Sequence, residues 1–257
     1  MKVLAIMSSP RKKDSFHVTQ KIEKILSDQE GVEFEYLFLS DHKLLQCVGC
    51  YDCLQHGERS CRLTDDRDLI FEKMKAADGI IFVTPSYAFQ VSSNLKMFIE
   101  RFAFLSLRPL FFDKAAMIVT TCSSPGYGLK EPTKYLRLIL FAWGFKKTFD
   151  IGNIVPIGYA PSEETAKRNE RTVTATTKAF YSSLTGTEKP KPSFKQLMQF
   201  KFLKMHSEVL HATYRADYEY YKAKDFFYDT DINPFHAFFA GILLNLIRKK
   251  LSKAVKA

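Results

Sequence analysis

The chain has 257 residues, of which 46% are hydrophobic and 26% are charged. This balance is typical of a globular protein with one large α/β core and an appendage. The apolar run in MKVLAIMSSP is too short for a secretory leader, and no segment approaches the roughly 18 apolar residues of a membrane span. We therefore expect a cytoplasmic protein, in which clustered cysteines serve metal or redox chemistry rather than disulfide bonds.

The formal net charge of +10 is concentrated near the C-terminus. Residues 189–257 contain 13 Lys and Arg against 6 Asp and Glu, so they contribute +7 of that total. The sequence has no zinc-finger pairing of histidines, no aromatic RNA-binding pattern and no basic helix-turn-helix signature. We therefore expect no nucleic-acid partner.

Five short apolar segments predict strands, and the segments between them have helical periodicity. In chain order, the strands are expected at residues 2–7, 32–39, 79–84, 115–121 and 149–155. Helices are expected from Asp14 or Ser15 to about Leu26, from about Asp65 to Ala77, and at residues 94–104, 133–143 and 162–184. Strands that are apolar on both faces and joined by helices predict an α/β fold, with a five-stranded parallel sheet covered by helices on both faces.

A linker is indicated by Pro190, Pro192 and the lysines beside them. We therefore divide the chain into a first domain, residues 1–187, and a basic, aromatic-rich helical C-terminal extension, residues 188–257. The last segment has apolar residues at helical spacing, followed by a basic cluster: Phe235, Phe238, Phe239, Ile242, Leu243, Leu246 and Ile247, then Arg248, Lys249, Lys250, Lys253 and Lys256. Such a helix packs on the first domain or on a partner subunit, which is the commoner case, or makes a peripheral contact with an anionic membrane.

The loops after the first, third and fourth strands are expected to line a ligand site, because ligands of such sheets bind beyond the carboxyl ends of the strands. The first of these loops, SSPRKKDS, joins a strand end to a helix start. Helix N-terminal amides, the hydroxyls of Ser9 and Ser15 and the guanidinium of Arg11 suit a phosphate. An ordinary capped turn explains the same residues.

The other two loops carry aromatic, hydroxyl and glycine residues. Residues 84–96 place Pro85, Tyr87 and Phe89 at a strand end, where they suit the edge and face of a flat ring system or simply pack beneath the loop. Residues 120–128, TTCSSPGYG, combine hydroxyls, glycines and Tyr127. Three such loops at one end of one sheet point to a binding site more strongly than any one of them.

Four of the five cysteines lie close together, with Cys47, Cys50 and Cys53 in the pattern C-x2-C-x2-C and Cys61 shortly after. This spacing lets three thiolates converge on a [4Fe–4S] cluster, whose fourth iron Cys61 would bind. Zinc is a second interpretation, although it usually takes two separated C-x2-C pairs. Reduced thiols without a metal are the third. Cys122 stands alone and is interpreted as a small buried residue.

Several of these motifs together resemble the flavodoxin-like NAD(P)H-dependent FMN reductases over residues 1–185. They are SPR in the first loop, the cysteine loop followed by Asp65 and Asp66, ADGIIFVTPSY at residues 77–87 and LKMFIER at residues 95–101. The compact cysteine motif is similar to that of the iron–sulfur flavoproteins. The resemblance implies FMN, with its phosphate in the first loop and its ring against the other two, in a homo-oligomer, commonly a dimer or tetramer. The residues expected to bind it are Ser9, Arg11, Ser15, Pro85, Ser86, Tyr87, Ala88, Phe89, Thr121, Ser123, Ser124, Gly126, Tyr127 and Gly128.

The resemblance also implies a function. NAD(P)H would reduce FMN, which would pass electrons to a small oxidised acceptor of the quinone, nitro or azo type. No catalytic side chain is required, because the flavin carries the chemistry. The alternative is an electron carrier with a [4Fe–4S] cluster on Cys47, Cys50, Cys53 and Cys61, exchanging electrons with a ferredoxin-like partner.

Overall fold

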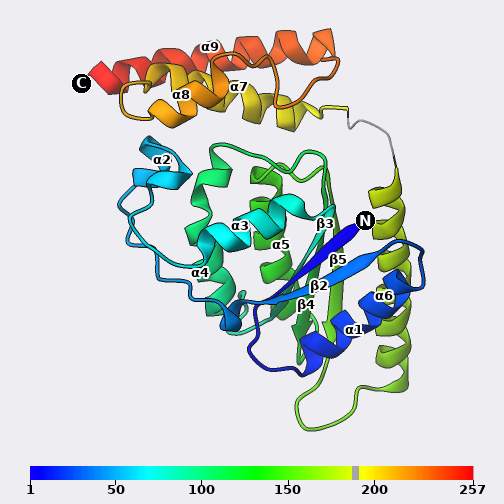
Figure 1. Ribbon diagram of the computed structural model, residues 1–257. Helices are drawn as coiled ribbons and strands as arrows, with labels where there is room; N and C mark the ends of the chain where they lie inside the picture. Colours follow the sequence, from blue (N-terminus) through cyan, green and yellow to red (C-terminus); the bar gives the residue numbers. More distant parts are fainter. Residues whose placement is uncertain (187–190, 257) are drawn as a thin grey trace.

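The computed structural model describes residues 1–186 and 191–256, without the side chains of residues 245, 246 and 248–256. Its five strands form one parallel sheet in the order β2-β1-β3-β4-β5 (Figure 1). The strands are β1 (Lys2–Met7), β2 (Glu33–Phe38), β3 (Gly79–Pro85), β4 (Ala115–Cys122) and β5 (Lys147–Ile154). This is the strand order of flavodoxin-like folds, so the expected fold class is confirmed.

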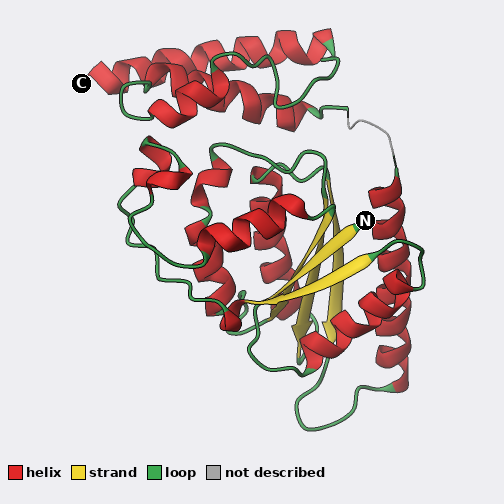
Figure 2. Cartoon of the chain, viewed as in Figure 1, coloured by secondary structure: helices red, strands yellow, loops and turns green. Residues whose placement is uncertain are grey.

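Helices cover both faces of the sheet (Figures 1 and 2). Side chains alternate along each strand, so that Leu4 and Ile6 belong to one buried cluster while Val3 and Ala5 belong to the other. The first cluster is covered by α3 (Arg67–Ala76), α4 (Ser93–Arg101) and α5 (Tyr127–Ala142), and the second by α1 (Asp14–Ser27) and α6 (Glu163–Thr185). Both faces being apolar explains why these strands have continuous apolar sequences.

Two helix boundaries differ from the sequence prediction. The helix expected from residue 133 begins at Tyr127, because α5 accommodates Pro132 in its second turn and gives up one amide donor there. The helix expected at residues 94–104 ends at Arg101, and the short 3₁₀ helix η3 (Ala103–Ser106) follows it. Both differences matter below, because Tyr127 lies beside the ligand pocket and Arg101 contacts a cysteine.

Three further helices form what we call the C-terminal helical unit, residues 193–256. They are α7 (Phe194–Val209), α8 (Arg215–Tyr221) and α9 (Pro234–Lys256). Ser193 and Gln196 form a capping box at the start of α7, and Phe200, Tyr221 and Phe227 lie in the unit's own buried cluster. The boundary expected at residues 187 and 188 falls outside the described residues, so the division into two domains stays a prediction.

The C-terminal helical unit packs at the edge of the sheet where the strands begin (Figure 1). Gln199 Nε2 donates to the carbonyl oxygen of Ala142 at the end of α5, at 3.3 Å. Phe227 stacks on Phe112, just before β4, with ring centroids 4.6 Å apart. The unit therefore leaves the opposite edge, where ligands of such sheets bind, uncovered.

Helix α9 has two apolar faces. Ala240 is fully buried in the core of the C-terminal helical unit, against which Leu107 and Phe112 of the first domain also pack. The other face is exposed and consists of Phe235, Phe238, Phe239, Ile242, Leu243 and Ile247, which we call the α9 stripe. The side chains of Leu246, Arg248, Lys249, Lys250, Lys253 and Lys256 lie outside the described residues. Among the described residues, no helix combines the length and apolarity needed to cross a bilayer.

Candidate functional site

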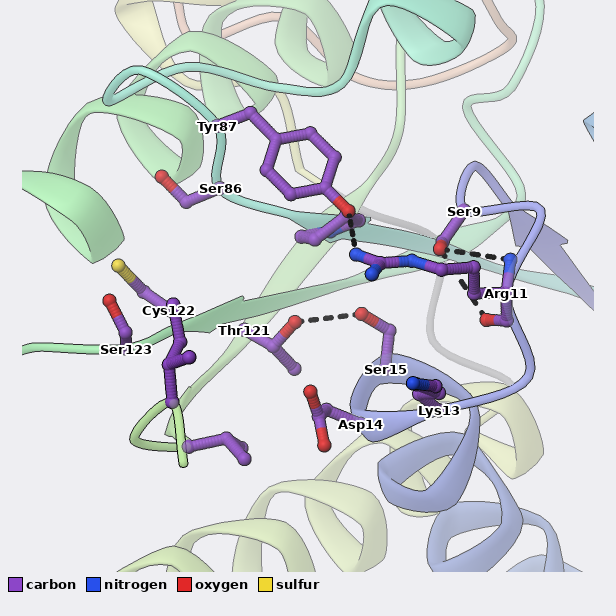
Figure 3. A pocket seen from close by; sticks show the side chains of 13 residues that line it. Ser9, Arg11, Lys13, Asp14, Ser15, Ser86, Tyr87, Thr121, Cys122 and Ser123 are labelled. Carbon is purple, nitrogen blue, oxygen red and sulfur yellow. Dashed lines mark hydrogen bonds between the residues drawn. The ribbon is translucent and has the colours of Figure 1, made fainter. Parts of the chain in front are cut away.

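A pocket of about 160 Å³ opens at the carboxyl ends of β1, β3, β4 and β5 (Figure 3). The lining residues are Ser9, Arg11, Lys13, Asp14, Ser15, Pro85, Ser86, Tyr87, Thr121, Cys122, Ser123, Val155 and Ile157. The three loops selected from the sequence therefore meet in one place.

The first loop ends at the start of α1, whose first amide groups have no acceptor within the helix. Two hydrogen bonds fix the first loop. Ser9 Oγ accepts from the Arg11 amide at 3.3 Å, and the buried hydroxyls of Ser15 and Thr121, at the end of β4, lie 2.7 Å apart. Lys13 and Arg11 also line the pocket beside this helix start. Free amides, hydroxyls and two cations are the groups that an anion-binding loop uses.

Arg11 and Tyr87 connect the first and second loops. Arg11 Nη2 donates to the Tyr87 hydroxyl at 2.7 Å, so the two side chains meet above the pocket (Figure 3). Beyond Tyr87 the chain turns sharply, with Ala88 and Phe89 at φ values of 46° and 63°. These two residues do not line the pocket, and Phe89 is exposed.

A buried hydroxyl on the second loop has no partner. Ser86 lines the pocket, and its Oγ is buried and makes no hydrogen bond within the described part of the chain. Buried polar groups are normally hydrogen-bonded, so this atom fits a site that a polar ligand completes.

The third loop depends on Gly128. A Cβ at this position would lie 2.3 Å from Cys122 Sγ and 3.7 Å from Ser86 Oγ, so a side chain cannot be added without moving the pocket wall. Ser124, Gly126, Tyr127 and Gly128 lie outside the pocket lining, whereas Thr121 and Ser123 belong to it.

Sequence reasoning missed five lining residues, which are Lys13, Asp14, Cys122, Val155 and Ile157. Val155 and Ile157 follow β5, and the rule of strand ends predicts them once the loop after the fifth strand is included. Cys122 was interpreted as a buried packing residue, but it is only partly buried and faces the pocket.

The four clustered cysteines line a second, smaller and mostly apolar pocket. Cys47, Cys50, Cys53 and Cys61 are free thiols and share it with Val48, Tyr51, Leu63, Arg67, Glu100 and Arg101. The loop contains only the short helices α2 (Asp52–Gln55) and η2 (Glu58–Ser60), with Tyr51 at φ 63°. Burial raises the pKa of the Cys53 thiol, and the neighbouring Cys61 and Cys47 raise it further.

Three buried arginines surround this cysteine pocket, and the sequence analysis had not selected any of them. Arg67, Arg101 and Arg108 expose at most 7% of their surface. Arg101 Nη1 donates to Cys61 Sγ at 3.1 Å. Arg67 Nη1 and Arg101 Nε are buried and have no hydrogen-bond partner in the described part of the chain. These spare buried donors suit hydrogen bonds to an anionic group held by thiolates.

Residues 1–186 and 191–256 contain no group of three or more His, Cys, Asp and Glu side chains arranged to hold a single metal ion. A cubane cluster makes a different demand, since it distributes four thiolates over four irons. Four thiols lining one pocket are the donor set that such a cluster uses.

Comparison with known proteins places these observations in a family. The sequence model described as NADPH-dependent FMN reductase matches residues 1–160. An iron-sulfur flavoprotein of Archaeoglobus fulgidus is 29% identical over 238 residues, covering 88% of this chain and 100% of its own. The iron-sulfur flavoprotein MJ1083 of Methanocaldococcus jannaschii is 40% identical over 101 residues, covering 39% of this chain and 51% of its own.

Solved structures agree on the fold. The crystal structure of RosB with a bound formylriboflavin phosphate intermediate covers 91% of this chain and 92% of its own, with a TM-score of 0.55 and 17% identity. Sheet, pocket and sequence thus define a flavodoxin-like flavoprotein. The chain belongs to the NADPH-dependent FMN reductase family and is related to the iron-sulfur flavoproteins. It is an NAD(P)H-dependent flavin oxidoreductase with FMN as its cofactor.

Proposed function

We propose that this oxidoreductase passes electrons from NAD(P)H through FMN to a small oxidised acceptor of the quinone, nitro or azo type. The observation that carries the proposal is the pocket at the strand ends, where a loop suited to an anion meets a wall of loop residues that is open to solvent. Because one wall is open to solvent, NAD(P)H and the acceptor can bind one after the other beside the same flavin ring. A pocket that is open to solvent therefore favours small acceptors.

Each part of the pocket has a proposed task toward FMN. Ser9, Arg11 and Ser15 hold the phosphate with the amides of the first turn of α1. Pro85, Ser86 and Tyr87 lie against the ring, with the unpartnered Ser86 hydroxyl free to hydrogen-bond its polar edge. Thr121 and Ser123 form the opposite wall. The bound flavin supplies the hydride and electron transfer.

Positions outside the pocket lining keep a weaker proposed role. Ala88, Phe89, Ser124, Gly126, Tyr127 and Gly128 shape the two loops rather than face the pocket. Phe89 and Tyr127 are both largely exposed. We propose that they limit which acceptors reach the ring.

Steady-state oxidation of NADH and NADPH by the FMN-loaded protein tests the proposal, with menadione, a nitroaromatic and an azo dye as acceptors. We expect turnover with at least one of them and none after FMN is removed. Reduction of the bound FMN without transfer to any of the three would count against it.

A second candidate function is favoured by the cysteine pocket. In this alternative, Cys47, Cys50, Cys53 and Cys61 hold a [4Fe–4S] cluster that exchanges electrons with FMN and a ferredoxin-like partner. The supporting observation is the four thiols in one pocket with Arg67 Nη1 and Arg101 Nε, two unpartnered donors suited to hydrogen-bond cluster sulfurs. Iron and acid-labile sulfide counts per FMN after anaerobic purification test it; about four of each are expected, and flavin alone would reject it.

For the exposed α9 stripe, we propose a homo-oligomer contact. Six exposed apolar side chains on one helix face resemble the apolar core of a subunit interface more than an ordinary surface. A peripheral membrane contact is the competing explanation, which the basic residues after the stripe favour.

A further inference from the structure

Arg108 lies where the cysteine loop meets the C-terminal helical unit. Its side chain is only 7% exposed and follows η3 in the chain. Nη2 donates to the carbonyl oxygen of Cys53 at 2.6 Å, and Nη1 donates to that of Leu54 at 3.2 Å. Both carbonyls belong to α2, a helix of one turn, whose last carbonyl groups have no amide donors within the helix. One guanidinium therefore holds the backbone at the centre of the cysteine loop.

The same guanidinium is held from the other side by Asp217 of α8. Arg108 Nη1 donates to Asp217 Oδ1, and the Asp217 side chain is 3% exposed. Glu58, in the cysteine loop, adds a carboxylate oxygen 3.5 Å from Nη2. A buried arginine requires such a counter-charge, because an unpaired buried charge is strongly unfavourable. The position of Arg108 thus depends on α8 being in place.

Two tyrosines fix α8 on both sides of Arg108. The Tyr221 hydroxyl donates to the carbonyl oxygen of Leu107 at 2.6 Å, and the Tyr220 hydroxyl donates to that of Pro109 at 2.5 Å. Tyr221 is almost fully buried. Figure 1 shows α8 directly beside α2. The residues before and after Arg108 are therefore bonded to α8, and its side chain bridges α8 and the cysteine loop.

We propose that the C-terminal helical unit positions the cysteine loop, with Arg108 and Asp217 as positioning residues for its thiols. The loop needs this support because it contains little regular structure and three of its residues have positive φ, Gly49, Tyr51 and Gly57. This proposal rests on the second candidate function only for the identity of the group that the thiols bind. The arrangement of the loop itself does not depend on a cluster.

Thiol alkylation in the full-length, FMN-loaded, metal-free protein tests the proposal. Iodoacetamide labels reduced cysteines, and peptide mass spectrometry gives a rate for each one. Asp217→Asn removes the counter-charge of Arg108. Arg108→Lys keeps a charge beside Asp217, but its single nitrogen cannot bridge the Cys53 and Leu54 carbonyls together. We expect the rate of Cys53 labelling to rise by about tenfold in both variants. Losing one charge-assisted hydrogen bond lets the cysteine loop open about that much more often, which exposes the thiol.

Controls separate positioning from general loosening. Glu219→Gln breaks the exposed Lys222–Glu219 pair on the same helix and should leave all rates at the wild-type value. Cys122, in the strand-end pocket, should label at the wild-type rate in every variant. Unchanged Cys53 rates in Arg108→Lys and Asp217→Asn would overturn the proposal, as would a parallel rise at Cys122. If Asp217→Asn does not fold, Arg108→Lys decides alone.

Iron content distinguishes this inference from the function on which it builds. Wild-type protein without iron would reject the cluster but leave the labelling result valid. If iron is present, Arg108→Lys should lose it faster than Glu219→Gln during dialysis against a chelator. Equal rates of loss would overturn the positioning role.

Discussion

Arg101 and Asp65 form an ion pair that is almost completely buried. Arg101 Nη2 donates to both carboxylate oxygens of Asp65, at 2.8 and 2.9 Å, and neither side chain is more than 2% exposed. Asp65 also accepts from the Leu45 amide at 2.8 Å. Although burial acts in the opposite direction, these hydrogen bonds hold the pKa of Asp65 below its usual value. The pair keeps Arg101 in place to contact Cys61.

Asp65→Asn should therefore be severely destabilising. It leaves a buried guanidinium without its counter-charge, which costs about 3–5 kcal/mol. Urea unfolding followed by circular dichroism gives the change in unfolding free energy. Glu163→Gln, which breaks the exposed Lys167–Glu163 pair, is the control and should change stability by at most about 0.5 kcal/mol. Similar values for the two variants would contradict a special role for the buried pair.

Gly128→Ala should weaken FMN binding through a steric clash. The new Cβ would lie 2.3 Å from Cys122 Sγ, so overpacking of about 1–3 kcal/mol is expected at the pocket wall. Flavin fluorescence quenching measures the FMN dissociation constant. Adding Cys122→Ala removes the sulfur atom and should restore affinity, since the Cβ of residue 122 lies at an ordinary 3.5 Å. A double variant as weak as Gly128→Ala would show that the clash is not the cause.

Arg11→Met tests the phosphate loop. The substitution removes a cation from the pocket, and a lost charge-assisted hydrogen bond should raise the FMN dissociation constant by about tenfold to a hundredfold. Riboflavin has the same ring and no phosphate, so its affinity should not change. Titrations of both flavins against wild type and variant make the comparison, and an equal loss for both would place Arg11 away from the phosphate.

Glu35 predicts a pH dependence of stability. Hydrogen bonds from Lys2, at 2.7 Å, and from Lys73, at 2.5 Å, lower the pKa of this β2 carboxylate. A lowered folded-state pKa contributes stability above the ordinary Glu value of 4.5, and that stability is lost as pH falls through the folded value. Glu35→Gln should cost about 0.5–1 kcal/mol at pH 7, and the difference from wild type should shrink steadily below pH 4.5. A difference that is constant with pH would contradict this origin.

The α9 stripe predicts a concentration-dependent assembly. Phe238→Ser with Phe239→Ser removes two of its exposed rings without touching the buried Ala240. We expect the variant to sediment as a smaller species than wild type in analytical ultracentrifugation. If both are monomers and only the wild type pellets with anionic vesicles, the stripe is a membrane contact instead.

Much of the fold was predictable because local pattern and tertiary environment agree. β1 occupies residues 2–7 as expected, since a strand buried on both faces needs a continuous apolar run and ends where Ser8 begins. α5 was placed too late because proline usually ends a helix, whereas the tertiary packing of Leu136 and Leu140 here holds the helix across Pro132. The sequence pattern contains no information on that packing.

The pocket was only partly predictable for a similar reason. Ser9, Arg11 and Ser15 come directly after a recognisable strand, so the rule of strand ends finds them. The sequence did not reveal the three buried arginines Arg67, Arg101 and Arg108. In a sequence, a buried arginine cannot be distinguished from an exposed one until its ion-pair partners are known. Asp217 lies more than a hundred residues from Arg108, and only the folded chain brings the two together.

Helix α4 joins the two sites. The hydroxyl of Ser92, its N-cap, donates to Ser8 at 2.8 Å beside the strand-end pocket, and its last residue, Arg101, donates to Cys61. Nine residue steps along the helix separate Ser92 from Arg101 by about 13.5 Å, and inserting one more residue would turn Arg101 by about 100° around the axis. A surface loop can gain or lose a residue without moving a distant site. The length of α4, in contrast, sets the distance and the angle between the strand-end pocket and the cysteine loop, so it cannot change without disturbing one of them.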